Sequence, residues 1–136
     1  MKDILVPISP GELLDKITIL RIKAARISDA QKLANVRTEL EALEQTWRES
    51  GATTGPAADA VLQDEAALQA VNERLWVIED DIRDHEREQR FDARFIELAR
   101  AVYVINDERA AIKKRINTAL GSRLVEEKSY KQYRPT

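Results

Sequence analysis

Residues 98–121, LARAVYVINDERAAIKKRINTALG, decide the fold class of this chain. Apolar side chains recur through the stretch at heptad spacing, at Leu98, Val102, Ile105, Ile112, Ile116 and Ala119. This spacing places them along one stripe of a helix. Asp92 is placed to cap the start of that helix, and Gly121 suits the left-handed backbone at which many helices end. The pattern therefore predicts a long helix of the kind found in helical bundles.

Three further helices are predicted upstream. Ser9-Pro10-Gly11-Glu12 forms a capping box with proline at the first helical position, which predicts a helix over residues 10–27. A second helix follows the capping residue Asp29, and a third covers residues 61–87. Residues 50–58, SGATTGPAA, have the glycine, proline and threonine content of a loop. We therefore expect one all-α domain over residues 1–136, an antiparallel four-helix bundle made of two helical hairpins.

Both ends of the chain are expected at the same pole of this bundle, because the first helix starts where the fourth ends. The strand-like runs at residues 4–6 and 123–125 would then be close enough for a short strand pairing. Polar residues are also expected to gather at this pole as a candidate anion site beside Gly11. They are Asp15, Lys16, Asn117, Glu127 and Lys128. The capping box alone also accounts for most of this cluster.

The composition narrows the chemistry of the protein. The 136 residues contain no cysteine and one histidine, His85. Thiolate catalysis, iron–sulfur clusters and zinc sites with sulfur or several imidazole ligands are therefore excluded, and we expect neither a metal nor a cofactor. His85 lies in a charged run, and we interpret it as a surface or flanking histidine.

Charge is distributed unevenly along the chain, although the net charge is only -2. Residues 39–88 carry 14 acidic and 4 basic side chains, whereas residues 113–136 carry 7 basic and 2 acidic ones. Nucleic-acid binding usually requires a dominant basic face, so this distribution argues against it. The sequence has neither the apolar stretch of a secretory signal at its start nor an apolar run of bilayer length. We expect a cytoplasmic protein without a membrane partner.

The third and fourth helices are expected to extend beyond the first two by roughly ten residues, or about 15 Å. They also carry apolar side chains away from their main stripes. Candidates for an interface on this second face are Trp76, Val77 and Tyr103. A second subunit or the C-terminal residues Leu124, Tyr130 and Tyr133 would bury such a face. The pattern favours a homodimer, and the two alternatives are compatible.

Arg109 occupies the most unusual position in the sequence. It stands between Ile105 and Ile112 in the apolar stripe, where leucine would be expected. Counting along an antiparallel bundle puts Arg109 level with Arg21, Asn72 and Glu73. A structural ion pair with Glu73 or another acid would fix helix register. Alternatively, interior side chains would hold a carboxylate or phosphate, and the candidates are Arg109, Arg21, Lys113 and Asn106.

A set of acids suggests a different chemistry. Glu44 and Glu79 flank apolar stripes, and Asp81 is close to Glu79, so these carboxylates are candidates for magnesium ligands in phosphate hydrolysis. Most acids in the run around Glu79 point away from the stripes, which is typical of a solvated surface. The solvated interpretation is therefore favoured.

Three blocks of the sequence together resemble a known family. They are PISPGELLDKITIL at residues 7–20, LWVIEDDIRDHE at 75–86 and LARAVYVINDERAAIKKRINTALGSRLVEEKSYKQY at 98–133. The blocks resemble a small bacterial family of proteins of about this length that is catalogued as a domain of unknown function. The resemblance implies a compact bacterial protein and brings no activity, substrate or catalytic residue.

The function therefore stays unknown at this level, with two main hypotheses. The first is a non-enzymatic helical interaction or accessory module that self-associates. The alternative is a small helical enzyme or binding protein for an anionic metabolite held by interior arginines. An Arg109 that faces an open pocket would favour the alternative, whereas a closed salt bridge would remove its basis.

Overall fold

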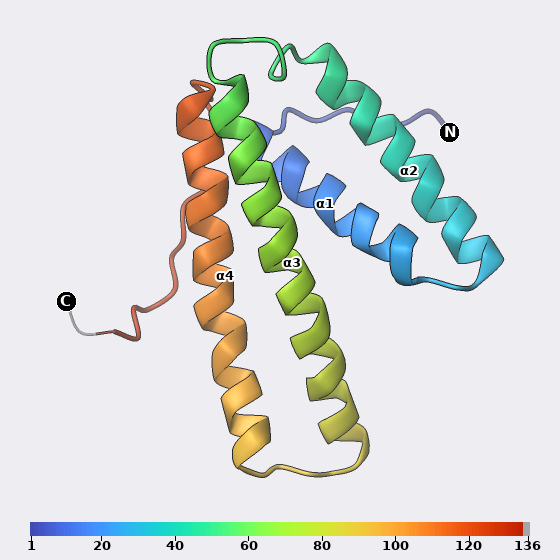
Figure 1. Cartoon of the computed structure of the whole chain (residues 1–136), viewed down its shortest axis with the longest axis vertical. Coiled ribbons are helices and arrows are strands. Elements are labelled where there is room, and N and C mark those ends of the chain that lie inside the picture. Colours follow the sequence, from blue (N-terminus) through green and yellow to red (C-terminus); the bar gives the residue numbers. More distant parts are fainter. Residues whose placement is uncertain (135–136) are drawn as a thin grey trace.

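The structure of the chain is a computed structural model that describes residues 1–134. Residues 135 and 136 of the predicted domain lie outside the described residues. Four α-helices form, namely α1 (Pro10–Arg26), α2 (Ala30–Glu49), α3 (Ala58–Arg87) and α4 (Ala93–Ala119) (Figure 1). The all-α prediction with four helices is confirmed. Within residues 1–134, none of the helices has both the length and the apolar character needed to cross a membrane.

The helix starts are determined by local side-chain chemistry. Ser9, Asp29 and Asp92 each accept a hydrogen bond from a backbone N–H three residues further on, at 2.8–3.2 Å. These side chains satisfy backbone donors that have no partner within the helix. After the end of α4, Gly121 has a positive φ of 65°. All three predicted caps and the predicted glycine stop are therefore present.

The central helix of the molecule is α1. The helices α3 and α4 form a long antiparallel hairpin, α1 lies against both of them, and α2 returns along the outer side of α1 (Figure 1). Within residues 1–134, α2 packs helix to helix against α1 alone. The arrangement is therefore more open than four helices around one core. A physical reason is that Trp47 is the single buried residue of α2, so this helix offers little apolar surface to a second neighbour.

The hydrophobic core lies where α1 meets the α3–α4 hairpin. Leu14, Ile17, Leu68 and Ile116 have exposed fractions of 0%. Trp47 extends this core to α2. Burial of each such side chain contributes about 1.5–3 kcal/mol to stability. The core therefore holds α1, α3 and α4 in fixed positions, and these three helices also carry the polar residues described below.

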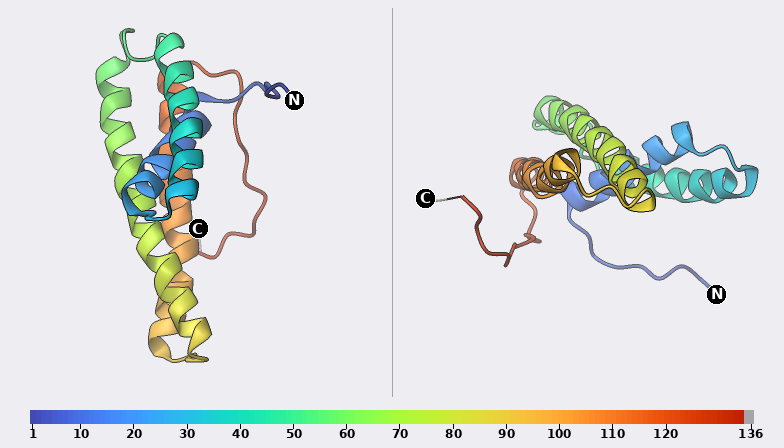
Figure 2. Two further views of the ribbon diagram at one scale, coloured as in Figure 1. Left: turned by 90° about the vertical axis from the view of Figure 1, so that its right-hand side faces the viewer. Right: turned by 90° about the horizontal axis from the view of Figure 1, so that it is seen from below.

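One end of the α3–α4 hairpin extends beyond α1 and α2, as two perpendicular views show (Figures 1 and 2). The expected difference in length is present, since α3 and α4 have 30 and 27 residues whereas α1 and α2 have 17 and 20. Several apolar side chains of this free end stay open to solvent. Val77 is 45% exposed, Phe91 53% and Ile96 58%.

The interpretation of His85 as a surface or flanking residue is wrong. This side chain is buried inside the free end, with its ring centroid 6.3 Å from that of Phe95. Its Nδ1 lies 2.9 Å from the Asp81 carbonyl oxygen, and its Nε2 lies 3.6 Å from Asp92 Oδ1. The reason is the short turn after α3, which places the start of α4 directly over His85.

The predicted strand pairing between the two ends is also wrong, because residues 1–134 contain no strand. The start of α1 and the end of α4 do meet, since Gly11 N–H donates to Asn117 Oδ1 at 2.7 Å. From there the two terminal segments separate (Figure 2). Ion pairs from Lys113 to Glu126 and from Lys128 to Asp107 hold the C-terminal tail (residues 122–134) along α4. Residues 1–7 are all exposed.

Candidate functional site

A buried polar network joins α1, α3 and α4, with Asn72 of α3 at its centre. The Asn72 side-chain amide donates to Asp15 Oδ1 at 3.0 Å and to Thr18 Oγ1 at 2.9 Å. All three residues are buried, with exposed fractions of 0–6%. The Thr18 hydroxyl in turn donates to the Asp15 carbonyl oxygen at 2.9 Å. A satisfied network of this kind favours one relative position of the helices that carry it.

Arg109 of α4 lies at the edge of this network. Its Nη1 donates to Asn72 Oδ1 at 3.5 Å, and the residue is half-buried. No carboxylate oxygen of residues 1–134 lies within 4.0 Å of its guanidinium. The alternative of an ion pair with Glu73 is therefore wrong, and Glu73 instead accepts a hydrogen bond from Gln69 at 3.2 Å. A guanidinium has five N–H donors, so most of those on Arg109 are free for a ligand or water.

Arg109 lines an open pocket of about 410 Å³ between α1, α3 and α4. Asn72 of α3 and Asn106 of α4 also line the pocket and contribute neutral side-chain amides. The apolar lining comes from Ile19, Ile22, Leu75 and Trp76. The remaining lining residues are charged and follow one another along α3: Glu79, Asp80 and Arg83. The volume lies within the range of small-molecule sites in proteins, about 300–1,000 Å³.

Arg21 does not join Arg109, contrary to the expectation that both arginines hold one anion. Its Nε lies 3.3 Å from Glu44 Oε1, and its Nη1 lies 3.7 Å from Glu65 Oε2. Arg21 lines a separate pocket of about 400 Å³ that also contains Trp47. Counting residues along antiparallel helices gives the height of a side chain and not its direction around the helix axis. That direction takes Arg21 towards α2.

Lys113 is occupied by protein carboxylates and is therefore not a free anion ligand, contrary to expectation. Its Nζ lies 2.5 Å from Glu12 Oε2, 3.0 Å from Glu126 Oε2 and 3.7 Å from Asp15 Oδ2. Burial by itself would lower the pKa of Lys113. The hydrogen bonds that Lys113 donates to Glu12 and Glu126, together with the negative charges of Asp15 and Glu12, outweigh burial and raise this pKa. Lys113 therefore stays a cation that connects α1, α4 and the tail.

The five predicted pole residues do not form one site. Asn117 binds the backbone of Gly11, and Asp15 faces the buried network and Lys113. Lys16 is exposed, at 3.9 Å from Glu12, and Lys128 pairs with Asp107 at 2.8 Å. Glu127 is exposed and makes no ion pair within residues 1–134.

Gly11 allows α4 to approach the start of α1 closely, at the place where the sequence analysis suggested a bound anion. A Cβ at this position would lie 2.6 Å from the Lys113 carbonyl oxygen. The space beside the start of α1 is therefore filled by α4.

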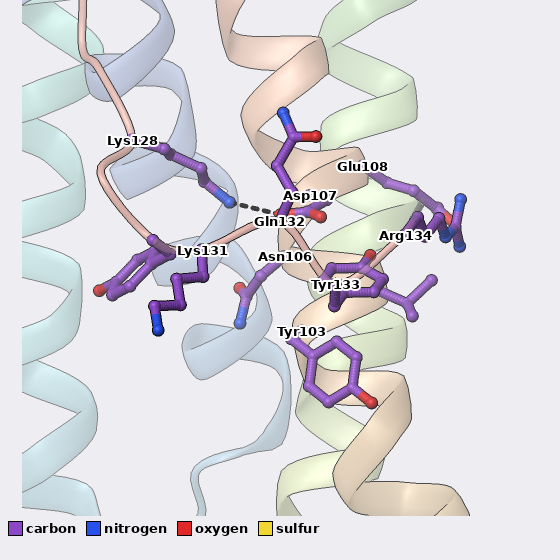
Figure 3. Close-up of a pocket in the computed structure, with 11 residues that line it drawn as sticks. Tyr103, Asn106, Asp107, Glu108, Lys128, Lys131, Gln132, Tyr133 and Arg134 are labelled. Atoms are coloured by element: carbon purple, nitrogen blue, oxygen red, sulfur yellow. Dashed lines mark hydrogen bonds and ion pairs between the residues drawn. The ribbon is translucent and has the colours of Figure 1, made fainter. Parts of the chain in front are cut away.

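The tail lies along α4 and forms the wall of a second pocket, of about 970 Å³ (Figure 3). Tyr133 packs edge-on against Tyr103, with ring centroids 4.8 Å apart. The hydrogen bonds that Asp107 accepts, first from Lys128 and then from Tyr133, lower its pKa. Loss of solvation and the contact with Asp107 raise the pKa of Tyr133. Tyr133 therefore covers part of the second apolar face, whereas Tyr130, which was also expected to bury it, is 85% exposed.

The three interface candidates lie in different surroundings. Trp76 is half-buried in the Arg109 pocket, and the guanidinium carbon of Arg26 lies 5.9 Å from its ring centroid. Tyr103 contacts the tail and stays 43% exposed. Val77 is 45% exposed. Of the three, Val77 alone belongs to the exposed apolar side chains of the free end, together with Phe91 and Ile96.

Two of the three acids considered for magnesium pair with protein arginines, whereas Asp81 makes no ion pair within residues 1–134. Glu44 pairs with Arg21, and Glu79 pairs with Arg83 at 2.7 Å. Within residues 1–134, no group of three or more His, Asp or Glu side chains is placed to hold a metal ion.

Thr18 is the functional candidate that the sequence did not suggest. Asp15 and Thr18 are three residues apart, and therefore lie on one face of α1 beside the buried Leu14 and Ile17. The sequence signal that could have identified this pair is the position of polar residues on the same helix face as a dense apolar stripe. The same signal marks Asn72, which follows Val71 in the stripe of α3.

Comparison with known proteins places the chain in a family. A model described as "Family of unknown function (DUF6165)" matches residues 4–136. The chain belongs to this family. No curated protein and no solved structure matches it. The match agrees with the resemblance to a family of unknown function, whereas the bacterial source stays a prediction.

Proposed function

We propose that this protein binds a small molecule with an anionic group, a carboxylate or a phosphate, in the pocket beside Arg109. The observation that carries the proposal is a half-buried arginine without a carboxylate partner in residues 1–134 that opens onto a pocket of about 410 Å³. Partial burial strengthens the attraction between Arg109 and an anion, because water screens the charges less. The setting implied by the sequence is the cytoplasm of a bacterium.

Asn72 supports the proposal because it positions the guanidinium. Both side-chain N–H groups of Asn72 have an acceptor, one on Asp15 and one on Thr18. Thr18 uses its own proton on the Asp15 carbonyl oxygen, so its Oγ1 accepts from Asn72. The orientation of the Asn72 amide is therefore determined, and its carbonyl oxygen is directed at Arg109. A guanidinium held in this way loses little conformational freedom when it binds an anion.

The remaining donors of Arg109 match a carboxylate or phosphate. A guanidinium is planar and offers pairs of parallel N–H groups, which bind two oxygens of one anion. Asn106 lines the same pocket and can donate a further hydrogen bond from its amide. Lys113 and Arg21 are not part of this proposal, because protein carboxylates already neutralise them.

A thermal-shift experiment tests the proposal with four probes, namely octanoate, benzoate, succinate and inorganic phosphate. A ligand of the native state at 100 times its Kd raises stability by about 2.7 kcal/mol, which is a shift of several degrees in Tm. We expect at least one probe to raise the Tm of the wild type and of Arg115→Gln, but not of Arg109→Gln. Arg115 is a matched control, since it is an exposed arginine on the same helix that pairs with Asp64. An equal shift in Arg109→Gln, or no shift with any probe, would overturn the proposal.

Self-association is a second candidate function, favoured by the exposed apolar side chains at the free end of the α3–α4 hairpin. Two helices alone leave Val77, Phe91 and Ile96 in contact with water. If a homodimer buries these side chains, a charge at position 96 should prevent dimer formation, and the variant Ile96→Glu should be monomeric. Sedimentation velocity at tens of micromolar should then show a dimer for the wild type and for the control Leu62→Glu, which lies outside the free end. A monomeric wild type would contradict this candidate.

A further inference from the structure

The Arg109 pocket has a shape that selects among anions, and the following inference rests on the proposed function. Its lining on α3 extends from Asn72 to Arg83. These positions are eleven residues apart, which corresponds to about 16 Å along a helix. The lining residues of α3 follow each other at steps of three and one, so they share one face of the helix. The pocket is therefore elongated along α3, and Arg109 lies at its Asn72 end.

The two ends of the pocket differ in charge. At the Asn72 end, Arg109 is a cation without a carboxylate partner in residues 1–134. At the other end, Arg83 is neutralised by Glu79, whose carboxylate and backbone carbonyl oxygens lie 2.7 and 3.0 Å from Arg83 Nη1. Asp80 remains there as an exposed carboxylate that makes no ion pair within residues 1–134. The far end is therefore negative.

The middle of the pocket is apolar. Its lining there consists of Leu75 and Trp76 from α3 and of Ile19 and Ile22 from α1. The Arg26 guanidinium lies 5.9 Å from the Trp76 ring centroid, within the range of a cation–π contact, and restricts the indole. A ligand segment in this region binds more tightly when it buries apolar surface there. A charge on that segment does not strengthen binding.

The net charge of the pocket argues against a doubly charged anion. Arg109 and Arg83 contribute two positive charges, and Glu79 and Asp80 two negative ones, so the lining is formally neutral. A phosphate dianion or a dicarboxylate would bring one charge to Arg109 and place the other near an apolar wall or an acid. A ligand with one carboxylate and one ammonium group leaves the pocket neutral and meets an opposite charge at each end.

We infer that the ligand is an elongated amino-carboxylate, with its carboxylate on Arg109, an apolar middle segment on Leu75 and Trp76, and an ammonium group on Asp80. Asn72 and Asp80 are eight residues apart, so the two charges of the ligand are separated by about 12 Å or slightly less. The carboxylate supplies most of the affinity, because Arg109 is half-buried. The ammonium group supplies selectivity, because an exposed ion pair changes affinity by at most roughly fivefold.

Four probes with the same eight-carbon chain separate the contributions of the two ends. They are 8-aminooctanoate, octanoate, octylamine and octanedioate. The readout is the NMR chemical shift of the Trp76 indole N–H, observed in Trp47→Phe so that one tryptophan remains. We expect 8-aminooctanoate to bind up to about fivefold more tightly than octanoate, and octylamine and octanedioate to bind more weakly than octanoate.

Variants of the two pocket ends complete the test. Asp80→Asn should reduce the affinity for 8-aminooctanoate to that for octanoate and leave octanoate unchanged. Asp84→Asn, an exposed acid of the same helix outside the pocket, should change neither. Arg109→Gln should weaken both carboxylates at least tenfold.

Three results would overturn the inference. They are tightest binding of octanedioate or inorganic phosphate, a fivefold preference that persists in Asp80→Asn, and no indole shift with any eight-carbon probe. The first two results leave the anion site at Arg109 intact. The proposed function itself fails only when no anion binds in an Arg109-dependent way.

Discussion

The backbone of Gly11 in α1 lies against the Lys113 carbonyl oxygen in α4, so closely that a Cβ on Gly11 would be 2.6 Å from that oxygen. Asn117 Oδ1 would be 2.9 Å from the same Cβ. This contact sets the distance between the two helices at the pole where α1 begins and α4 ends. It therefore also sets the positions of the polar side chains one turn further along both helices.

Replacement of Gly11 by alanine should destabilise the protein. Alanine favours an ordinary helix by up to about 1 kcal/mol over glycine. Here the clash with α4 outweighs that gain, and we expect a net loss of about 1–3 kcal/mol in the free energy of unfolding. Urea denaturation measures this loss. Gly55→Ala is the control, because its Cβ would meet no atom closer than 3.9 Å, and a similar loss there would contradict the interpretation.

Replacement of Asn72 by alanine should be more damaging than replacement of an exposed asparagine. It leaves Asp15 Oδ1 and Thr18 Oγ1 without their donor inside the core. Each buried polar group that loses its partner costs about 1–3 kcal/mol. The matched variant is Asn35→Ala, since Asn35 is exposed on α2. Chemical denaturation of both variants checks the difference, and equal stabilities would show that the network contributes little.

Arg109→Met and Lys113→Met should differ strongly although the residues are one helical turn apart. Arg109 has no carboxylate partner in residues 1–134, so methionine in the apolar stripe should change the free energy of unfolding by less than about 1 kcal/mol. Lys113→Met leaves the buried Asp15 beside an unneutralised Glu12 and should cost about 2 kcal/mol or more. A large loss for Arg109→Met would assign that arginine a structural role instead.

Stability should fall in alkaline solution because the pKa of Lys113 is raised in the folded state. The contribution of the charged Lys113 is complete below its ordinary pKa of 10.5 and is lost as pH rises through the higher folded value. The raised pKa of Tyr133 acts in the same direction. Urea midpoints between about pH 9 and about pH 11.5 measure the decline. It should be shallower in Lys113→Met than in the wild type, with Tyr133→Phe separating the tyrosine contribution.

Local patterns in the sequence predicted four helices and the starts of three of them correctly, whereas α3 begins at Ala58, before the predicted start at residue 61. Ser9, Asp29 and Asp92 cap helices through groups three residues away, so their effect does not depend on the tertiary fold. Heptad spacing also identified Arg109 as a charged residue at a position of the apolar stripe. These features are short-range, and a single chain segment contains all the information that determines them.

The contacts between side chains of different helices were less predictable from the sequence. Counting put Arg21 level with Arg109, but Arg21 contacts Glu44 of α2 and Glu65 of α3 instead. Residue counting carries no information on which side of a helix a neighbour packs. The terminal strand pairing failed for a related reason, since the tail makes ion pairs with α4 that involve side chains far apart in sequence. His85 was misplaced because the turn after α3 covers it.

The attachment of α2 to α1 alone implies an order in which parts of the molecule open. When α2 detaches, α1 keeps its contacts with α3 and α4, whereas detachment of α1 also removes the support of α2. Amide hydrogens of α2 should therefore exchange with solvent at a lower opening free energy than those of α1, with Leu14 and Ile17 among the last to exchange. The chain would then lose its outer helix while the polar network between α1, α3 and α4 is still intact.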